Sequence, residues 1–429
     1  MDKYLIIGAG PAGLSAGVAL SANSIPFEIV DAGVKVGGIW DISRKETPMY
    51  KSAHFISSRT LSGFSDYPIP TDYPDYPNHE LVQSYIEDYA SHHDLNKSIH
   101  FNTKVSKAIP TDNKWSVTFD NGTKGTYAGL IIATGITWHK NFPALQGKYS
   151  GRIIHSFDYK SSELFKDKKV LIIGAGNSGC DIACDAAREA GQAFISMRRG
   201  YYFIPKYLFG MPSDLFKEKY GFPIKRIDRF ISELLLNKVV VGNLENYGLQ
   251  KPDHGLLQSH PIMNNRLLHH LGHGDISAKP DIDSCDGKMV RFKDGSQEEI
   301  DLIVTATGYK RTFPFLDDEI IKSKEHKQVD LYLEMFHRTH DNLFFTGGIE
   351  VSSAIFGLLS LQGETIAAAI KAKNRGNTSY KNFLDDKRTK QHNLKRNNRY
   401  ISSLRHERYV DKPSYQKLLK RQIKSFAHD

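Results

Sequence analysis

Short apolar runs that are followed within two residues by a glycine dominate the hydrophobic pattern of this chain. Four of them lie at residues 4–7, 130–133, 170–173 and 302–306, and each consists mainly of isoleucine, leucine and valine. Runs that are this short and apolar throughout are typical of strands in a parallel sheet that is buried on both faces. An alanine-rich stretch with helical potential follows the first and third runs. The pattern therefore predicts an α/β fold.

The first and third runs lead into nearly the same glycine loop. The first loop is Gly8-Ala9-Gly10-Pro11-Ala12-Gly13, and the second is Gly174-Ala175-Gly176-Asn177-Ser178-Gly179. A strand, a GxGxxG loop and a helix in this order bind the pyrophosphate of a dinucleotide with backbone N–H groups. Two copies predict two Rossmann-like dinucleotide-binding domains, with an electron path between the two nucleotides. The chain is therefore expected to be an oxidoreductase.

The end of the next strand in each unit predicts which dinucleotide it binds. The strand at 27–30 ends at Asp31, 23 residues after the first glycine of its loop, where a carboxylate accepts hydrogen bonds from an adenosine ribose. FAD and NAD both fit that position. The strand at 193–196 is followed by Arg198 and Arg199, and guanidinium groups there can pair with a ribose 2′-phosphate. NADPH is predicted over NADH, with an ordinary surface arginine pair as the alternative.

Further glycine turns are expected to contact the cofactors, because glycine lets the backbone approach a flat ligand closely. A helix predicted over residues 357–371 would direct its N-terminus at a cofactor phosphate. The additional candidates are Gly38, Trp40, Thr134, Gly135, Thr307, Gly308, Tyr309, Gly347 and Gly348.

The runs at 130–133 and 302–306 look like counterparts on either side of the second glycine loop, which predicts an inserted domain. The expected division is a first dinucleotide domain over 1–160 and 300–370 and a second over 161–299. A basic, helical C-terminal extension is expected over 371–429.

Composition narrows the class of protein. With 40% hydrophobic and 24% charged residues, the chain is neither fibrous nor disordered. Three cysteines are too few for a disulfide framework, and no uninterrupted apolar run is long enough to span a bilayer, so a cytoplasmic protein is expected. Cys180 and Cys184 are expected to pack in a core rather than to form a redox pair. No metal is expected, because His260, His269, His270 and His273 have no standard ligand spacing.

The net charge of +9 is concentrated at the C-terminus, where residues 371–429 contain 17 Lys and Arg against 5 Asp and Glu. A basic segment can bind nucleic acid or anionic lipid. This one also has regularly placed apolar residues, so helices packed on a core with a solvated basic face are favoured. No nucleic-acid partner is expected, and a peripheral membrane contact is the less favoured alternative. A homodimer would be the commonest assembly. The apolar residues are Leu394, Tyr400, Leu404, Tyr409, Tyr415, Leu418, Leu419 and Ile423.

The chain resembles the flavin-containing monooxygenases, a family of class B flavoprotein monooxygenases. The two glycine loops, residues 37–40 and residues 305–309 occur in the family's order, and the resemblance covers about residues 1–370. The most specific segment has Tyr149, then Gly151, His155 and Tyr159 at spacings of two, four and four. The resemblance implies that this segment links an FAD domain to an inserted NADPH domain and helps to align the cofactors.

The resemblance also implies the reaction. FAD, reduced by NADPH, would react with O2 to form a C4a-hydroperoxyflavin, which transfers one oxygen atom to an amine nitrogen or a sulfide sulfur of a small molecule. Related Baeyer–Villiger enzymes, which act on ketones, usually have Trp at the position of Tyr159. They are the first alternative, and a non-oxygenating NADPH-binding flavoprotein that acts as an oxidase or sensor is the second.

One departure from the family lies at the expected flavin. Members often have Asn a few residues after a Tyr-Lys-Ser-like segment, which starts here at Tyr50. The Asn position falls on Ile56, so Ser57, Ser58 and His54 are the candidates to supply a polar group. No catalytic residue is assigned, and the substrate is left open.

Overall fold

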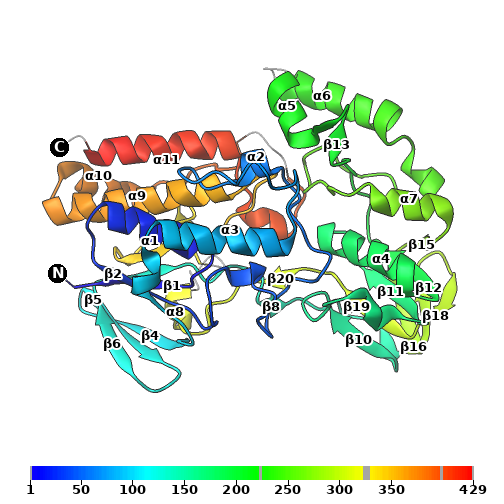
Figure 1. The fold of residues 1–429 in the computed structure, drawn as a ribbon, viewed down its shortest axis with the longest axis horizontal. Coiled ribbons are helices and arrows are strands. Elements are labelled where there is room, and N and C mark those ends of the chain that lie inside the picture. Colours follow the sequence, from blue (N-terminus) through cyan, green and yellow to red (C-terminus); the bar gives the residue numbers. More distant parts are fainter. Residues whose placement is uncertain (1, 222–224, 322–328, 397–399, 428–429) are drawn as a thin grey trace.

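The computed structural model describes residues 2–221, 225–321, 329–396 and 400–427. The molecule has two lobes side by side, each built on a mainly or wholly parallel sheet that leads into one of the glycine loops (Figure 1). The two Rossmann-like units predicted from the sequence are therefore both present. Within these ranges, no helix combines the length and the apolar character needed to cross a membrane.

The central strand of the first sheet is β1 (Tyr4–Ile7), which pairs in parallel with β2 (Phe27–Val30) and β7 (Gly129–Ile132). β23 (Leu343–Phe345) extends the sheet in parallel beyond β7. Every residue of β1 and β7 is buried, because layers cover both faces of the sheet. The short strands at the two edges are β3 (Ile99–His100), β21 (Leu331–Tyr332) and β22 (Phe336–His337).

Helices cover one face of this sheet and a three-stranded meander covers the other (Figure 1). The helical layer is formed by α1 (Pro11–Ala22), α3 (His79–His92) and α9 (Phe356–Arg375). α1 and α9 pack closely, since a Cβ atom on Gly363 would lie 2.6 Å from the carbonyl oxygen of Ser15. The meander strands are β4 (Val105–Thr111), β5 (Lys114–Phe119) and β6 (Lys124–Tyr127).

The second sheet has the order β10-β19-β11-β12-β15, and all its strands are parallel. Its strands are β10 (Arg152–His155), β11 (Lys169–Ile173), β12 (Gln192–Ser196), β15 (Ile276–Lys279) and β19 (Leu302–Thr305). The covering helices α4 (Asn177–Glu189) and α7 (Arg266–His273) lie on one face. The other face packs on a small sheet of β9 (Gly147–Tyr149), β16 (Ile282–Gly287), β17 (Met289–Phe292) and β18 (Gln297–Glu299).

Two strands of this second sheet lie outside residues 161–299. β10 comes before that range and β19 comes after it, yet β19 is hydrogen-bonded between β10 and β11. A four-residue apolar strand does not encode which of two parallel sheets it joins. β19 pairs with β11 in the second sheet in the same way as β7 pairs with β1 in the first. The chain therefore returns to the first sheet only with the strands from β21 onwards.

Between β12 and α7 the chain leaves the second sheet. It forms the hairpin of β13 (Tyr207–Leu208) and β14 (Met211–Pro212) and the helices α5 (Ser213–Tyr220) and α6 (Lys225–Leu235), seen at the upper right of Figure 1. This excursion also contacts the first lobe, where the Ser58 backbone N–H donates to Asp214 at 2.7 Å.

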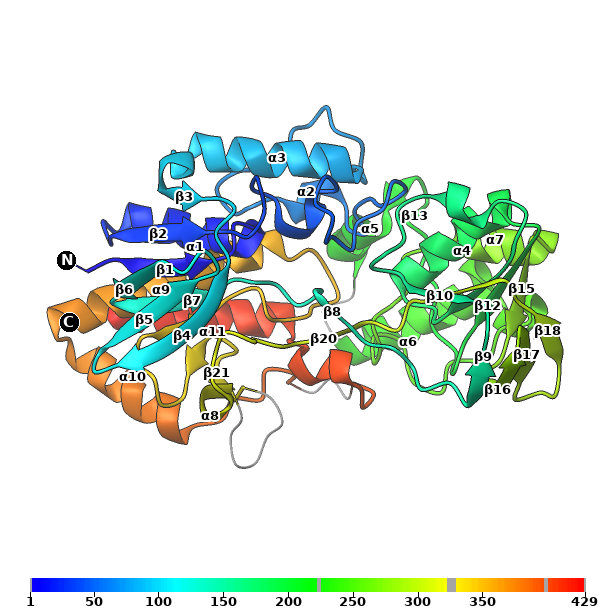
Figure 2. The ribbon, with the colours of Figure 1, turned by 90° about the horizontal axis from the view of Figure 1, so that it is seen from below.

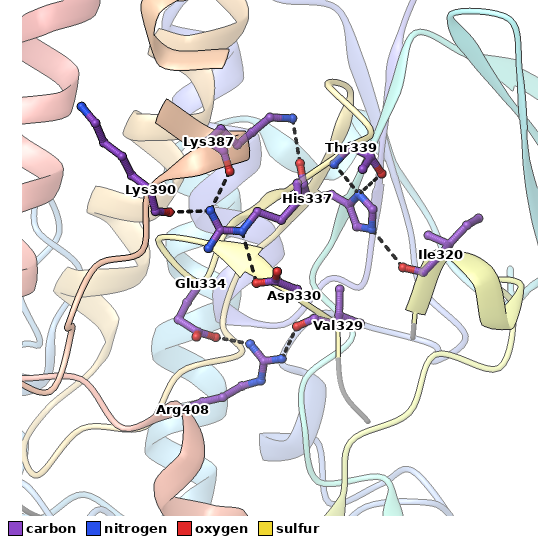
Figure 3. Close-up of polar contacts among 10 residues, drawn as sticks. Ile320, Val329, Asp330, Glu334, His337, Thr339, Lys387, Lys390 and Arg408 are labelled. Atoms are coloured by element: carbon purple, nitrogen blue, oxygen red, sulfur yellow. Dashed lines mark hydrogen bonds and ion pairs between the residues drawn. The ribbon is translucent and has the colours of Figure 1, made fainter. Parts of the chain in front are cut away.

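The basic C-terminal segment folds back on the first lobe through α10 (Thr378–Thr389) and α11 (Lys412–Ala427), and apolar side chains of both helices join the core of that lobe. Tyr409, Tyr415 and Leu419 are buried, and the side chain of Leu404 lies outside the described part. The basic face is only partly solvated. Lys387 is 1% exposed and its Nζ donates to the His337 carbonyl at 2.7 Å and to Asp341 at 2.6 Å. Figure 3 shows the bond from Lys387 to the His337 carbonyl, together with the ion pair of Arg408 with Glu334.

Replacing Lys387 with Met should lower the free energy of unfolding by about 1–3 kcal/mol, because the buried His337 carbonyl loses its donor. Lys390→Met is the matched control. Its ammonium pairs with Asp386 one helical turn away in an exposed position, where a change of at most about 0.5 kcal/mol is expected. Urea denaturation of both variants measures the difference, and equal losses would contradict the anchoring role of Lys387.

Candidate functional site

The two glycine loops have the same backbone geometry. Their first glycines, Gly8 and Gly174, have φ values of +114° and +101°, a region that favours glycine. A Cβ atom on Gly13 would lie 1.8 Å from the Gly8 carbonyl oxygen, and one on Gly179 would lie 2.0 Å from that of Gly174. In each loop the third glycine therefore lets the helix N-terminus approach the end of its strand.

The middle glycines differ from their neighbours because space is open around them. A Cβ atom on Gly176 would have no atom within 4 Å among the described residues, and one on Gly10 would meet only Gly38, at 3.5 Å. Each open space lies at the N-terminus of a helix, α1 or α4, where backbone N–H groups and the helix dipole favour an anion. Each loop thus has the room and the donors that a pyrophosphate requires.

Asp31 ends β2 beside the first loop, as predicted for a ribose-binding carboxylate. Its two oxygens accept hydrogen bonds from the backbone N–H groups of Ala9 at 2.7 Å and Gly33 at 2.6 Å. Arg44 forms an ion pair with the carboxylate at 3.0 Å and lies 5.1 Å from the centroid of the Trp138 ring. The sequence pattern did not identify Arg44, because no motif spacing relates it to Asp31.

The remaining candidates of the first lobe gather around the same sheet edge. Gly37 donates to the Ala9 carbonyl at 3.1 Å, and Gly38 follows with φ of +60° in the turn that leads to Trp40. Thr134, Gly135, Gly347 and Gly348 come directly after β7 and β23. Since the carboxyl ends of parallel strands share one edge, these turns and the first glycine loop face one ligand region.

Gly347 and Gly348 pack against neighbours on two sides. A Cβ atom on Gly347 would lie 2.7 Å from that of Ala12, in the first loop, and one on Gly348 would lie 2.2 Å from Nη2 of Arg311. The Gly347 N–H donates to Gln362 of α9 at 3.0 Å. The contact with Ala12 brings the end of β23 against the first loop. Neither Arg311 nor Gln362 was identified from the sequence.

In the second lobe, the two predicted arginines have different environments. Arg198 lies two residues after β12. It is exposed and forms no ion pair or side-chain hydrogen bond with the described residues. Arg199 is partly buried, and its Nε lies 3.9 Å from a carboxylate oxygen of Asp253. Arg198 is therefore the more available of the two for an added phosphate. In the loop itself, the Asn177 side chain accepts from the Met263 backbone N–H at 2.9 Å, whereas Ser178 is exposed.

The two connections between the lobes pair with each other as β8 (His139–Lys140) and β20 (Tyr309–Lys310), seen between the lobes in Figure 2. His155 lies at this crossing with no exposed surface. Its Nδ1 accepts from the Phe157 N–H at 3.1 Å, so its Nε2 donates to the Gly308 carbonyl at 3.0 Å. Burial lowers the pKa of His155, which favours this neutral form. Both nitrogens are engaged, so His155 crosslinks the connections.

Tyr149, Gly151 and Tyr159 of the same segment also make contacts within the protein. The Tyr149 hydroxyl donates to the Ile300 carbonyl at 2.9 Å, and a Cβ atom on Gly151 would meet that hydroxyl at 2.3 Å. Tyr159 is fully buried, and its hydroxyl donates to Asp185 of α4 at 2.9 Å. Thr307, at the crossing, donates to the Asn141 carbonyl at 2.5 Å.

Two carboxylates on α4 join the lobes, and neither was identified from the sequence. The Tyr50 hydroxyl donates to Asp181 at 3.1 Å, and Ser52 donates to Asp185. Burial raises the pKa of Asp181 to about 6. One helical turn separates the two acids, so α4 presents both toward the loop of Tyr50 and Ser52.

A cavity of about 110 Å³ lies where loops of the two lobes meet. Ile56 and Ser57 line it, whereas Ser58 and His54 do not. The Ser57 hydroxyl is hydrogen-bonded to Ser62 at 2.7 Å, and His54 Nδ1 donates to the Ser52 carbonyl at 2.7 Å. Ser58 is fully buried. The cavity is completed by Ile204, Ser213, Asp214, Leu257, His260, Pro261, Met263, Ser352 and Ser353.

A second cavity, of about 470 Å³, lies within the second lobe between α7 and the excursion. His269 and His273 of α7 line it with ring centroids 4.0 Å apart, whereas His260 lines the smaller cavity instead. The four histidines that the sequence singled out are therefore not brought to one place. Across the described ranges, no three His, Cys, Asp or Glu side chains are grouped as metal ligands.

Comparisons with known proteins agree with this geometry. A family model described as flavin-binding monooxygenase-like matches residues 1–424. Human flavin-containing monooxygenase 5 is 32% identical over 404 residues, covering 86% of this chain and 73% of the relative. Human flavin-containing monooxygenase 3 is 31% identical over 394 residues, covering 86% and 74%.

Solved structures share the fold at lower identity. S-allyl-L-cysteine S-oxygenase from Allium sativum superposes with a TM-score of 0.68 at 21% identity, covering 99% of this chain and 88% of that one. A steroid monooxygenase bound to NADP has a TM-score of 0.72 at 20% identity, with 99% and 98% covered. With two glycine loops and a match along nearly its whole length, this chain belongs to the family of flavin-binding monooxygenases, which use FAD and NADP(H).

Proposed function

We propose that this enzyme transfers one oxygen atom from O2 to the nitrogen of an amine or the sulfur of a sulfide, in a small molecule bound in the 110 Å³ cavity. The observation that supports this most directly is the place of the cavity. It is formed by the Ile56 loop and the residues after Gly348 from the first lobe and by Met263 and its neighbours from the second. A substrate there would lie between the regions that fit the two cofactors.

The first lobe fits FAD. The open face of Gly10 and the N-terminus of α1 accommodate a pyrophosphate, and Asp31 stands where a ribose hydroxyl would donate to it. When bound and reduced by NADPH, FAD supplies the activation of O2. Residues of this chain would position the FAD. Gly37 and Gly38 permit close approach of the backbone. The Trp40 ring that follows them packs edge-on against Phe55, with the two ring centroids 5.0 Å apart.

The second lobe fits NADPH. The open face of Gly176 at the N-terminus of α4 accommodates the pyrophosphate, and Arg198 is free to pair with a 2′-phosphate. The hydroxyl bonds from Tyr50 and Tyr159 to α4 hold this lobe against the first. They would keep the two dinucleotides at a set separation.

The cavity is well suited to binding a soft, weakly polar substrate and poorly suited to proton transfer by a side chain. Ile56, Ile204, Leu257 and Met263 give it apolar walls, which hold water away from the reacting atoms. Its one carboxylate, Asp214, already accepts from the backbone N–H groups of Ser58 and Leu215. With Ile56 in place of an amide side chain, a strong polar contact is absent from that wall, which favours small substrates with apolar substituents.

The two alternatives are less well supported. The Tyr159 hydroxyl bonds to buried Asp185, a contact that fixes tyrosine rather than the tryptophan usual in Baeyer–Villiger enzymes. A sensor acting through a free basic tail fits poorly, because Lys387 and Arg408 anchor that tail to the first lobe. We also place the enzyme in the cytoplasm, since its three cysteines are buried and unpaired.

The proposed activity is tested by incubating the FAD-loaded protein with NADPH, O2 and a panel of small tertiary amines, sulfides and ketones. We expect NADPH oxidation coupled to formation of an N-oxide or a sulfoxide. Ester formation from ketones alone would favour the Baeyer–Villiger alternative. Release of hydrogen peroxide with every substrate would contradict oxygen transfer and would indicate an oxidase.

Substituting the middle glycines should separate the two cofactor sites. Gly10→Val should fold but lack FAD, because the new side chain enters open space that the pyrophosphate needs. Gly176→Val should retain FAD and lose NADPH binding for the same reason. FAD content by absorbance and NADPH affinity by fluorescence titration measure both. A flavin-replete Gly10→Val protein, or two variants with the same defect, would contradict the assignment.

Removing the exposed arginine should change the preference between nucleotides. Arg198→Ala should weaken NADPH binding about tenfold to a hundredfold and leave NADH binding nearly unchanged, because only NADPH has the 2′-phosphate. Arg199→Ala, which removes a side chain near Asp253, is the control with the smaller expected effect. Equal weakening of NADPH and NADH by Arg198→Ala would overturn the 2′-phosphate contact.

A further inference from the structure

Arg311 is a partly buried cation without an acidic partner among the described residues. Its Nη1 donates to the Gly348 carbonyl at 3.2 Å, and its guanidinium carbon lies 5.1 Å from the centroid of the Phe313 ring. The Nε atom is buried and has no hydrogen-bond partner among the described residues. No carboxylate of the described part lies within ion-pair distance of the guanidinium. Most buried charges in proteins are paired, so this arrangement needs an explanation.

The nearby acid is already engaged. Glu334 forms an ion pair with Arg408 from the C-terminal segment, and Arg408 also donates to the Val329 carbonyl at 2.5 Å (Figure 3). Burial, and then the like charge of Arg408, lower the pKa of the Arg311 guanidinium. In the protein without a ligand, the charge of Arg311 is therefore uncompensated at close range.

The guanidinium lies at the edge of the sheet where the first lobe fits its dinucleotide. It packs on Gly348, where a Cβ atom would lie 2.2 Å from Nη2. The preceding residue, Gly347, packs on Ala12 in the first glycine loop. β1, β7 and β23 all end at this edge, and ligands of such sheets bind outside the carboxyl ends of the strands.

We propose that Arg311 is an anion-binding residue of the FAD site, whose guanidinium pairs with an anionic oxygen of the cofactor. This proposal rests on the assignment of FAD to the first lobe. FAD offers such oxygens in two places: the pyrophosphate, charged in both redox states, and the pyrimidine carbonyl of the flavin, which gains negative charge on reduction. A planar guanidinium suits either, because its N–H donors match paired oxygens.

The test compares Arg311→Gln with Arg311→Lys in the full-length protein, prepared without flavin and titrated with FAD. Gln keeps a polar amide but has no charge, whereas Lys keeps the charge. Lys310→Met is the matched control, since it removes an exposed positive charge one residue away. The readouts are the Kd for oxidised FAD and the midpoint potential of the bound flavin.

If the anion is the pyrophosphate, Arg311→Gln should raise the Kd for FAD about tenfold to a hundredfold with little change in potential. If the anion is the reduced flavin, the Kd for oxidised FAD should stay unchanged. The midpoint potential should then fall by about 30 mV for each tenfold loss in the affinity of the protein for reduced relative to oxidised flavin. In either case Arg311→Lys should lie closer to the wild type than Arg311→Gln does.

Two results would overturn the role of Arg311. One is a Kd and a potential for Arg311→Gln that match those of the wild type and of Lys310→Met. The other is an equal defect in the Gln and Lys variants, which would indicate a packing role for the guanidinium. A wild-type protein that binds no FAD would instead overturn the cofactor assignment itself, so the two failures are distinguishable.

Discussion

The close approach of a helix N-terminus to the end of a parallel strand is the constraint on which the rest of this structure depends. At Gly13 and at Gly179 a Cβ atom would overlap the carbonyl oxygen of the first glycine of the same loop. Only glycine allows that distance, and the helix dipole then points into space left open beside Gly10 and Gly176. The same geometry thus creates the fold of each lobe and the anion site within it.

Two such sites are useful only at a defined separation, and side-chain hydrogen bonds join the lobes in addition to the paired connections of β8 and β20. Tyr50 and Ser52 of the first lobe donate to Asp181 and Asp185 on α4, the helix that starts at the second glycine loop. Tyr159 donates to Asp185 from the connecting segment. The hydroxyls bond to these carboxylates, and Asp181 also accepts from the Asn264 side chain at 2.7 Å. The segment around Tyr159 is therefore bonded to the same helix as the loop of Tyr50 and Ser52.

The buried and partly buried cations discussed above divide into two groups in the first lobe. Lys387 and Arg408 arrive with the basic C-terminal segment and find Asp341 and Glu334, so their charge fastens that segment to the sheet. Arg311 finds a carbonyl and an aromatic ring but no acid among the described residues. A charge that the protein does not compensate is most simply understood as a binding group for a charged ligand. Arg311 lies at the edge of the sheet where the anionic groups of the dinucleotide would bind.

The sequence by itself determined the local features of this protein. The apolar runs specify strands, the glycine spacing specifies the two loops, and Asp31 and Arg198 follow because a Rossmann unit places them at fixed offsets. Contacts between distant segments were decided only by the tertiary structure. β19 joins the second sheet, Arg44 meets Asp31, and Ile56 and Ser57 reach the cavity while His54 does not. Spacing along the chain cannot predict these contacts, because each depends on how segments with no fixed offset between them pack in three dimensions.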